Sequence, residues 1–119
     1  MKHNFRELKV WARAMDFVTD IYSLTQKFPK EELFGLTSQL RRAATSIPLN
    51  IAEGSGGSSN AEFIRFLEIA RRSLYEVMTA LEVAKRLKYA APDEIERLLK
   101  EADEIAAMIS GLLKSLKQA

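Results

Sequence analysis

The chain has 119 residues, of which 47% are hydrophobic and 29% charged, and its net charge is +2. This length fits one domain with one core, and the balanced composition excludes a disordered chain or a long polycationic arm. The absence of cysteine excludes disulfides, thiolate nucleophiles and cysteine-bound zinc. We therefore expect residues 1–119 to form a single domain.

The sequence also bears on location. No stretch combines a charged start, an apolar run and a small-residue cleavage site, so we expect no signal peptide. No apolar run approaches the roughly 20 residues that a membrane helix needs. We expect a cytoplasmic protein that does not contact a membrane.

Glycine and proline interrupt the chain at residues 28–30, 53–59 and 91–93, which leaves four segments. The first segment carries two neighbouring apolar stripes with helical spacing. One stripe contains Leu8, Trp11, Met15, Val18, Tyr22 and Thr25, and the other Val10, Ala14, Phe17, Ile21, Leu24 and Phe28. Together they form an apolar face wider than one helix–helix seam needs.

The other three segments have helical spacing as well. In the second, Gly35 marks a boundary between a short turn and the main helix. The third opens with Ser59 and Glu62, which form a capping box, and the fourth opens with Pro92, which suits a first helical position. The expected core positions are Leu33, Leu36, Leu40, Ala43, Ile47 and Ile51, then Phe63, Phe66, Ala70, Leu74, Val77, Leu81 and Ala84, then Ile95, Leu98, Ala102, Ile105, Ile109, Leu112 and Leu116.

Four helices with short connections predict an all-α, antiparallel up-down-up-down four-helix bundle. The second apolar stripes need a cover once the first ones fill the core. Large exposed apolar patches usually mark an interface, so we expect the chain to associate with itself.

The sequence contains no recognisable catalytic machinery. His3 is the only histidine and is expected to be a solvated tail residue, so we predict no metal, no cofactor, no small-molecule substrate and no enzyme activity. Glu53, between Ile51 and the glycine-rich stretch, is interpreted as a helix-end residue, with a functional carboxylate as the alternative. The stretch 54–59 lacks the Gly-Lys-Ser/Thr of a P-loop and is expected to be a connection.

The basic residues suggest a polyanion partner. Basic side chains outnumber acidic ones in residues 1–30 and 61–90, and the reverse holds in 91–119. The two arginine pairs of the middle helices and their basic neighbours are candidates for phosphate contact, with ordinary surface salt bridges as the alternative for each. The candidates are Lys9, Arg13, Arg41, Arg42, Arg71, Arg72, Lys85, Arg86 and Lys88.

Several runs of residues resemble a known bacterial family. They are 8–15 (LKVWARAM), 21–25 with 28–29, 32–44 (ELFGLTSQLRRAA), 46–48, 50–56 (NIAEGSG), and Glu62, Phe63, Phe66, Leu67, Ala70, Arg71, Ser73 and Glu76. In this combination the chain resembles the 23S rRNA intervening-sequence proteins, also called S23 ribosomal proteins, over about residues 5–90.

The resemblance implies a four-helix bundle that assembles into a homopentamer and has no enzyme activity. It also implies similarity to the accessory variability protein of diversity-generating retroelements, a basic pentamer that binds nucleic acid. Two positions depart from the family pattern: Gly57 replaces an arginine, and Arg72 stands where a small residue is usual, next to the close approach of two helices. We expect an accessory factor that binds RNA or DNA, with a scaffold for a partner protein as the alternative.

Overall fold

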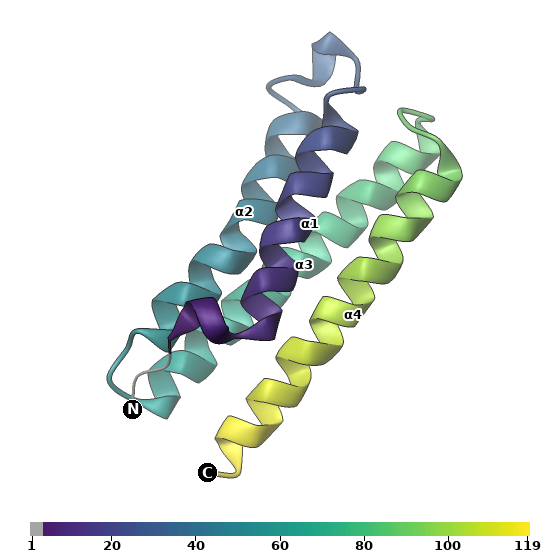
Figure 1. Ribbon diagram of the computed structural model, residues 1–119. Helices are drawn as coiled ribbons and strands as arrows, with labels where there is room; N and C mark the ends of the chain where they lie inside the picture. Colours follow the sequence, from purple (N-terminus) through teal and green to yellow (C-terminus); the bar gives the residue numbers. More distant parts are fainter. Residues whose placement is uncertain (1–3) are drawn as a thin grey trace.

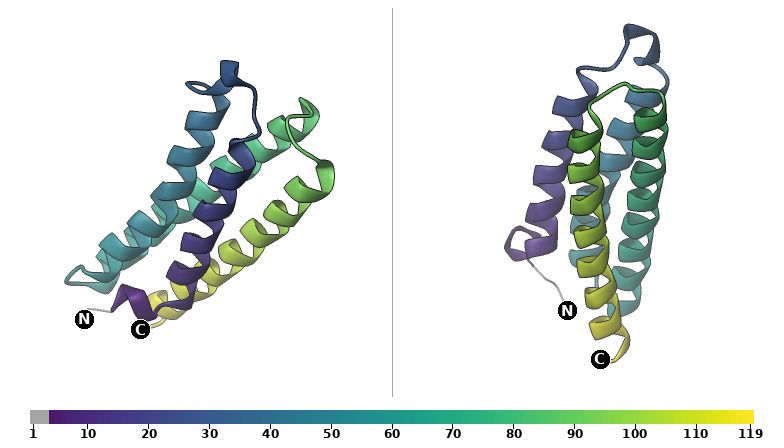
Figure 2. Two further views of the ribbon diagram at one scale, coloured as in Figure 1. Left: turned by 45° about the horizontal axis from the view of Figure 1, so that its top comes forward. Right: turned by 90° about the vertical axis from the view of Figure 1, so that its right-hand side faces the viewer.

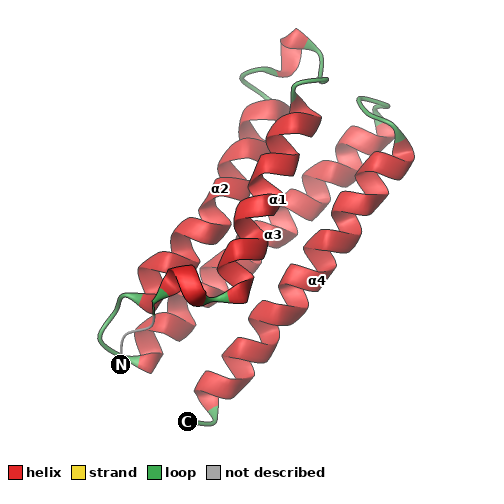
Figure 3. Cartoon of the chain, viewed as in Figure 1, coloured by secondary structure: helices red, strands yellow, loops and turns green. Residues whose placement is uncertain are grey.

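The computed structural model describes residues 4–119. Four long helices, α1 (Lys9–Thr25), α2 (Leu36–Ser55), α3 (Asn60–Arg86) and α4 (Pro92–Lys117), account for most of the chain (Figure 3). Two short 3-10 helices, η1 (Phe5–Glu7) and η2 (Lys30–Glu32), precede α1 and α2. Strands are absent from this part of the chain. His3, expected to be a tail residue, lies outside the described residues.

The four helices run alternately up and down along a bundle with extents of 45 × 23 × 20 Å (Figures 1 and 2). Helix α2 packs against α1 and α3, and α4 packs against α3 and α1. This arrangement confirms the predicted all-α four-helix bundle. Within residues 4–119, none of the helices combines the length and hydropathy that crossing a bilayer requires.

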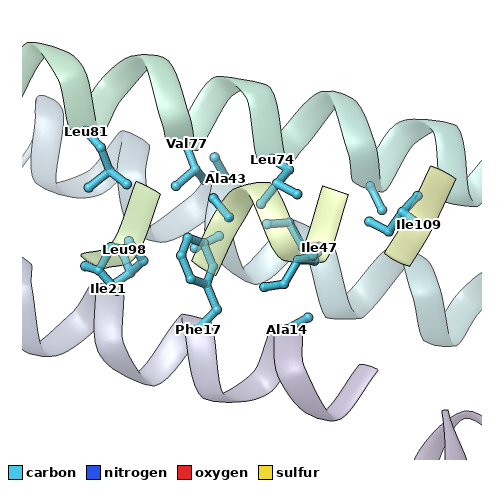
Figure 4. Close-up of a cluster of buried hydrophobic side chains, with 14 of the residues drawn as sticks. Ala14, Phe17, Ile21, Ala43, Ile47, Leu74, Val77, Leu81, Leu98 and Ile109 are labelled. Atoms are coloured by element: carbon cyan, nitrogen blue, oxygen red, sulfur yellow. The ribbon is translucent and has the colours of Figure 1, made fainter. Parts of the chain in front are cut away.

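All four helices contribute to one core (Figure 4). On α1 the core stripe is the one through Ala14, Phe17 and Ile21, which are fully buried. The stripe through Trp11 and Met15 lies along the outer edge of the α1–α2 pair. The expectation that the stripe through Trp11 and Met15 fills the core is wrong, because α2 and α4 pack against the neighbouring stripe through Ala14 and Phe17.

The predicted core positions of α2, α3 and α4 are confirmed with four exceptions, of which Leu36 is half-buried against the core. Leu67 rather than Phe66 is buried in α3, and Leu113 rather than Leu112 is buried in α4. Phe66 and Leu112 are half-buried, because a helix residue next to a core position lies at the edge of the buried face. Leu33 is 51% exposed, because it lies in the turn before α2 rather than on the helix.

The predicted boundary at Gly35 is confirmed. The carboxylate of Glu32 accepts hydrogen bonds from the Leu36 backbone N–H at 3.0 Å and from the Tyr89 hydroxyl at 2.7 Å. These bonds lower the pKa of Glu32, with the backbone bond as the larger cause. A Cβ on Gly35 would lie 2.7 Å from Oε1 of Glu32, so the glycine admits the carboxylate that caps α2.

The ends of α3 follow local sequence signals. Ser59 caps its start, since its Oγ accepts from the Glu62 backbone N–H at 3.1 Å. At the other end Lys88 adopts a positive φ of 61°. The N–H of Lys88 then bonds to Lys85 and the N–H of Tyr89 to Ala84, a Schellman motif in which glycine is the usual residue. This turn directs the chain into α4.

Candidate nucleic-acid interface

The solvent face of α3 carries a row of arginines. Arg65 and Arg72 are one heptad apart, and Arg86 lies two heptads beyond. Seven residues make nearly two helical turns, so these side chains share one face at intervals of about 10 Å or twice that. All three are exposed, and none forms an ion pair within residues 4–119. The Arg65 guanidinium lies 4.5 Å from the centre of the Phe66 ring.

Arg42 of α2 is exposed at the α2–α3 seam. It lines a polar groove of about 650 Å³ together with Gln39 of α2 and Glu76 of α3. The floor of the groove includes Ser46 and Ser73, whose hydroxyls are 2.9 Å apart. The Arg42 side chain is exposed, so its guanidinium can reach a bound anion.

Four of the nine candidate cations are already engaged by other helices. Arg13 of α1 donates to Glu101 at 2.8 Å and to Glu104 at 2.7 Å, both on α4. These carboxylates raise the pKa of Arg13 and fix its guanidinium in the α1–α4 seam. Lys85 is bound to Glu96 of α4, which raises the pKa of Lys85. Both side chains fit the structural interpretation rather than phosphate contact.

The first arginine of each pair is engaged as well. Arg41 donates to the Thr25 hydroxyl at 2.8 Å and stacks 4.6 Å from the centre of the Tyr22 ring. Arg71 donates to the Ser110 hydroxyl at 3.1 Å. In both pairs the second arginine, Arg42 or Arg72, is exposed.

The structure therefore does not gather the nine candidates into one patch. Arg42 lines the α2–α3 groove and Arg72 and Arg86 lie on the solvent face of α3, whereas Lys9 is exposed at the start of α1 and Lys88 at the α3–α4 turn. The sequence interpretation missed Arg65. Its heptad spacing to Arg72 and Arg86 is visible in the sequence and could have identified it.

The structure explains the two departures from the family pattern. The expectation that Arg72 stands beside a close helix approach is wrong, because Arg72 points to solvent and Ser73 is the residue that faces α2. At Gly57 a Cβ would lie 2.1 Å from Oε1 of Glu62. An arginine at position 57 would therefore require the Glu62 side chain to turn away.

The carboxylates of the described residues do not converge. Glu53 is exposed in the last turn of α2, which agrees with its interpretation as a helix-end residue. Within residues 4–119, no three His, Asp or Glu side chains are grouped closely enough to hold a metal ion.

Comparisons with known proteins agree with these features. The family model of the 23S rRNA-intervening sequence proteins matches residues 6–111. The chain belongs to this family. The fold is similar to a crystal structure from the S23 ribosomal protein family of Bacteroides thetaiotaomicron, a protein described as having unknown function, with a TM-score of 0.80 and 27% identity over 88% of this chain and 98% of that one. A search of curated proteins gave no match.

Proposed function

We propose that this family member is a non-catalytic, self-associating bundle that binds structured RNA through the exposed arginines Arg42, Arg65, Arg72 and Arg86. The arginine row on α3 is the observation that carries the proposal. Arginine is well suited to phosphate because its planar fork of donors matches the phosphate oxygens. The family name, which refers to sequences within 23S rRNA, favours RNA over DNA as the partner.

Self-association would strengthen this binding. A net charge of +2 per chain is small, but an assembly of several copies, a pentamer by family resemblance, multiplies the number of arginine rows and the local field. The expected location is the cytoplasm, where ribosomal RNA is present.

The test is RNA binding by fluorescence anisotropy, with a labelled structured rRNA fragment, at low and moderate salt. We expect the variant Arg72→Gln/Arg86→Gln to bind more weakly and to reduce the slope of log K against log salt by about 2, because each phosphate contact contributes about 1. The matched control is Lys100→Gln/Lys114→Gln, which removes two exposed cations from α4 and should retain the wild-type slope.

Two results would contradict the proposal. One is the absence of salt-dependent RNA binding by the wild type at low ionic strength. The other is an equal loss of RNA binding in the two double variants. If the protein bound duplex DNA of the same length equally well, the preference for RNA would be wrong, but the arginine interface would still stand. The second candidate, a scaffold for a partner protein, is favoured by an apolar groove that Trp11 and Met15 of α1 and Leu49 of α2 line. It predicts a complex that persists at high salt.

A further inference from the structure

The outer surface of the α1–α2 pair is hollowed into an apolar groove of about 420 Å³. Trp11, Met15 and Val18 of α1 form one wall, and Pro48 and Leu49 of α2 form the other. Met15 is 43% exposed and Leu49 is 68% exposed. None of the residues that line the groove is charged, and charge depletion with aromatic residues and methionine is typical of the centre of a protein interface.

The opposite end of the same chain carries a protruding apolar turn. This turn, residues 30–35, connects α1 to α2 and projects beyond the helix ends (Figure 1). Its tip exposes Leu33 by 51% and Phe34 by 93%. Backbone hydrogen bonds from Glu32 to Pro29, from Leu33 to Lys30 and from Gly35 to Glu32 fix its shape, so Phe34 is held outward by an ordered backbone.

Charges around the two features are complementary. Arg6 lies over the Phe5 ring at one end of the groove, 4.6 Å from its centre. Arg41 lies over Tyr22, one turn beyond the other end. The protruding turn carries two carboxylates, Glu31 and Glu32, and one cation, Lys30, so its net charge is negative. An inserted Phe34 would therefore bring a negatively charged turn toward Arg6 and Arg41 at the two ends of the groove.

We propose that the 30–35 turn of one copy inserts Phe34 into the α1–α2 groove of a second copy of this chain. The inference rests on the proposed self-association and assigns its contact surface. In a ring, each copy would present its turn to one neighbour and its groove to the other. Such a head-to-tail contact forms a ring where the rotation between copies closes.

The test begins with solution mass by light scattering. Phe34→Ser removes the inserted side chain, and Leu49→Lys places a charge in the groove. Both positions are exposed, so circular dichroism should show wild-type helix content. We expect each variant alone to be monomeric. The control Tyr75→Ser changes a side chain that is 51% exposed on α3 and should retain the wild-type mass.

Mixing the two variants tests whether the turn of one copy contacts the groove of another. The Leu49→Lys copy retains an intact turn and the Phe34→Ser copy an intact groove, so one good contact remains. We expect a 1:1 complex that grows no further. A mixture that stays monomeric while the wild type is oligomeric would overturn the assignment.

Cross-linking provides a second test that keeps Phe34 in place. The chain has no native cysteine, so a mixture of Leu33→Cys, on the exposed tip of the turn, and Leu49→Cys should form a disulfide-linked dimer under mild oxidation, whereas neither variant alone should. A monomeric wild type would contradict the proposed self-association itself. An oligomeric wild type that neither variant disrupts and that forms no mixed disulfide would overturn only this contact.

Discussion

The two seams that flank α4 differ from the other two seams of the bundle. Each ion pair that links two different elements within residues 4–119 involves α4. These pairs are Arg13 with Glu101 and Glu104, Asp20 with Arg97, Lys27 with Glu94, Lys85 with Glu96, and Lys117 with Glu68. No ion pair crosses the α1–α2 or α2–α3 seam in the same part of the chain.

The α1–α2 and α2–α3 seams are closed instead by apolar packing and by hydrogen bonds without ion pairs, such as Arg41 to Thr25 and Ser46 to Ser73. Gly54 of α2 is so close to α3 that a Cβ would lie 2.7 Å from the Cβ of Phe66. The difference matters at the surface, because charged rims are well solvated whereas an apolar rim is not. The same core therefore has an α4 side that can face water and an α1–α2 side that favours a protein neighbour.

The largest effect should separate core from rim on α1. Phe17→Ala empties a fully buried position and should lower the free energy of unfolding by about 3–5 kcal/mol. Met15→Ala, on the exposed rim, should lower it by less than about 1 kcal/mol in the monomer. Urea denaturation measures both. Similar decreases in the free energy of unfolding for the two variants would show that both α1 stripes are equally buried, which would contradict the distinction between core and rim.

The next effect probes the close α2–α3 seam. Gly54→Val should lower the free energy of unfolding by about 1–3 kcal/mol, because the added methyl groups overlap Phe66 and Phe63. Gly56→Ala is the matched control, since its Cβ would meet only backbone oxygens at 3.7 and 3.8 Å. Thermal and urea unfolding of the two variants should therefore diverge. A fully stable Gly54→Val protein would show that these helices have room to separate.

The α4 seams should respond to acid. Hydrogen bonding to Arg13 lowers the pKa of Glu101. A carboxyl with a lowered folded-state pKa adds stability above its unfolded pKa and loses it as the pH falls through the folded value. The wild type should therefore lose up to about 1 kcal/mol more than Arg13→Gln between neutral pH and about pH 3, since the pair is partly exposed. Parallel pH profiles would show that the pair contributes no stability.

The smallest effect concerns the turn that leads into α4. Lys88 has a positive φ, which strains any residue with a Cβ, so Lys88→Gly should raise the free energy of unfolding by up to about 1 kcal/mol. The same variant removes an exposed cation that lies apart from the four proposed arginine contacts, so RNA affinity should stay close to that of the wild type. Lys88→Ala is the control, because it removes the charge but retains the Cβ. An equal stability change in both variants would contradict the backbone explanation.

Local signals in the sequence predicted much of the fold. Gly35, Ser59 and Pro92 marked helix boundaries correctly, because each acts through its own backbone or its neighbours within a turn. The predicted heptad seam of α4 was correct apart from Leu112, which is half-buried while its neighbour Leu113 is buried. Where α1 offered two stripes, periodicity had no means to rank them.

The candidate interface was predicted less well. Composition identified the basic residues, but a cation is available only if no carboxylate from another helix reaches it. Arg13 and Lys85 are occupied by residues of α4 far away in the sequence, which no local pattern indicates. Arg65 was overlooked, although its spacing of seven residues from Arg72 can be read from the sequence alone.

By itself the sequence determined four amphipathic helices, their order and their family, because helix periodicity, caps and breaks are local properties of the chain. The tertiary structure alone decided which stripe of α1 is buried, which arginines remain free, and that an apolar groove and an exposed Phe34 lie at opposite ends of the bundle. These properties depend on the distance between residues far apart in the chain, and packing fixes that distance.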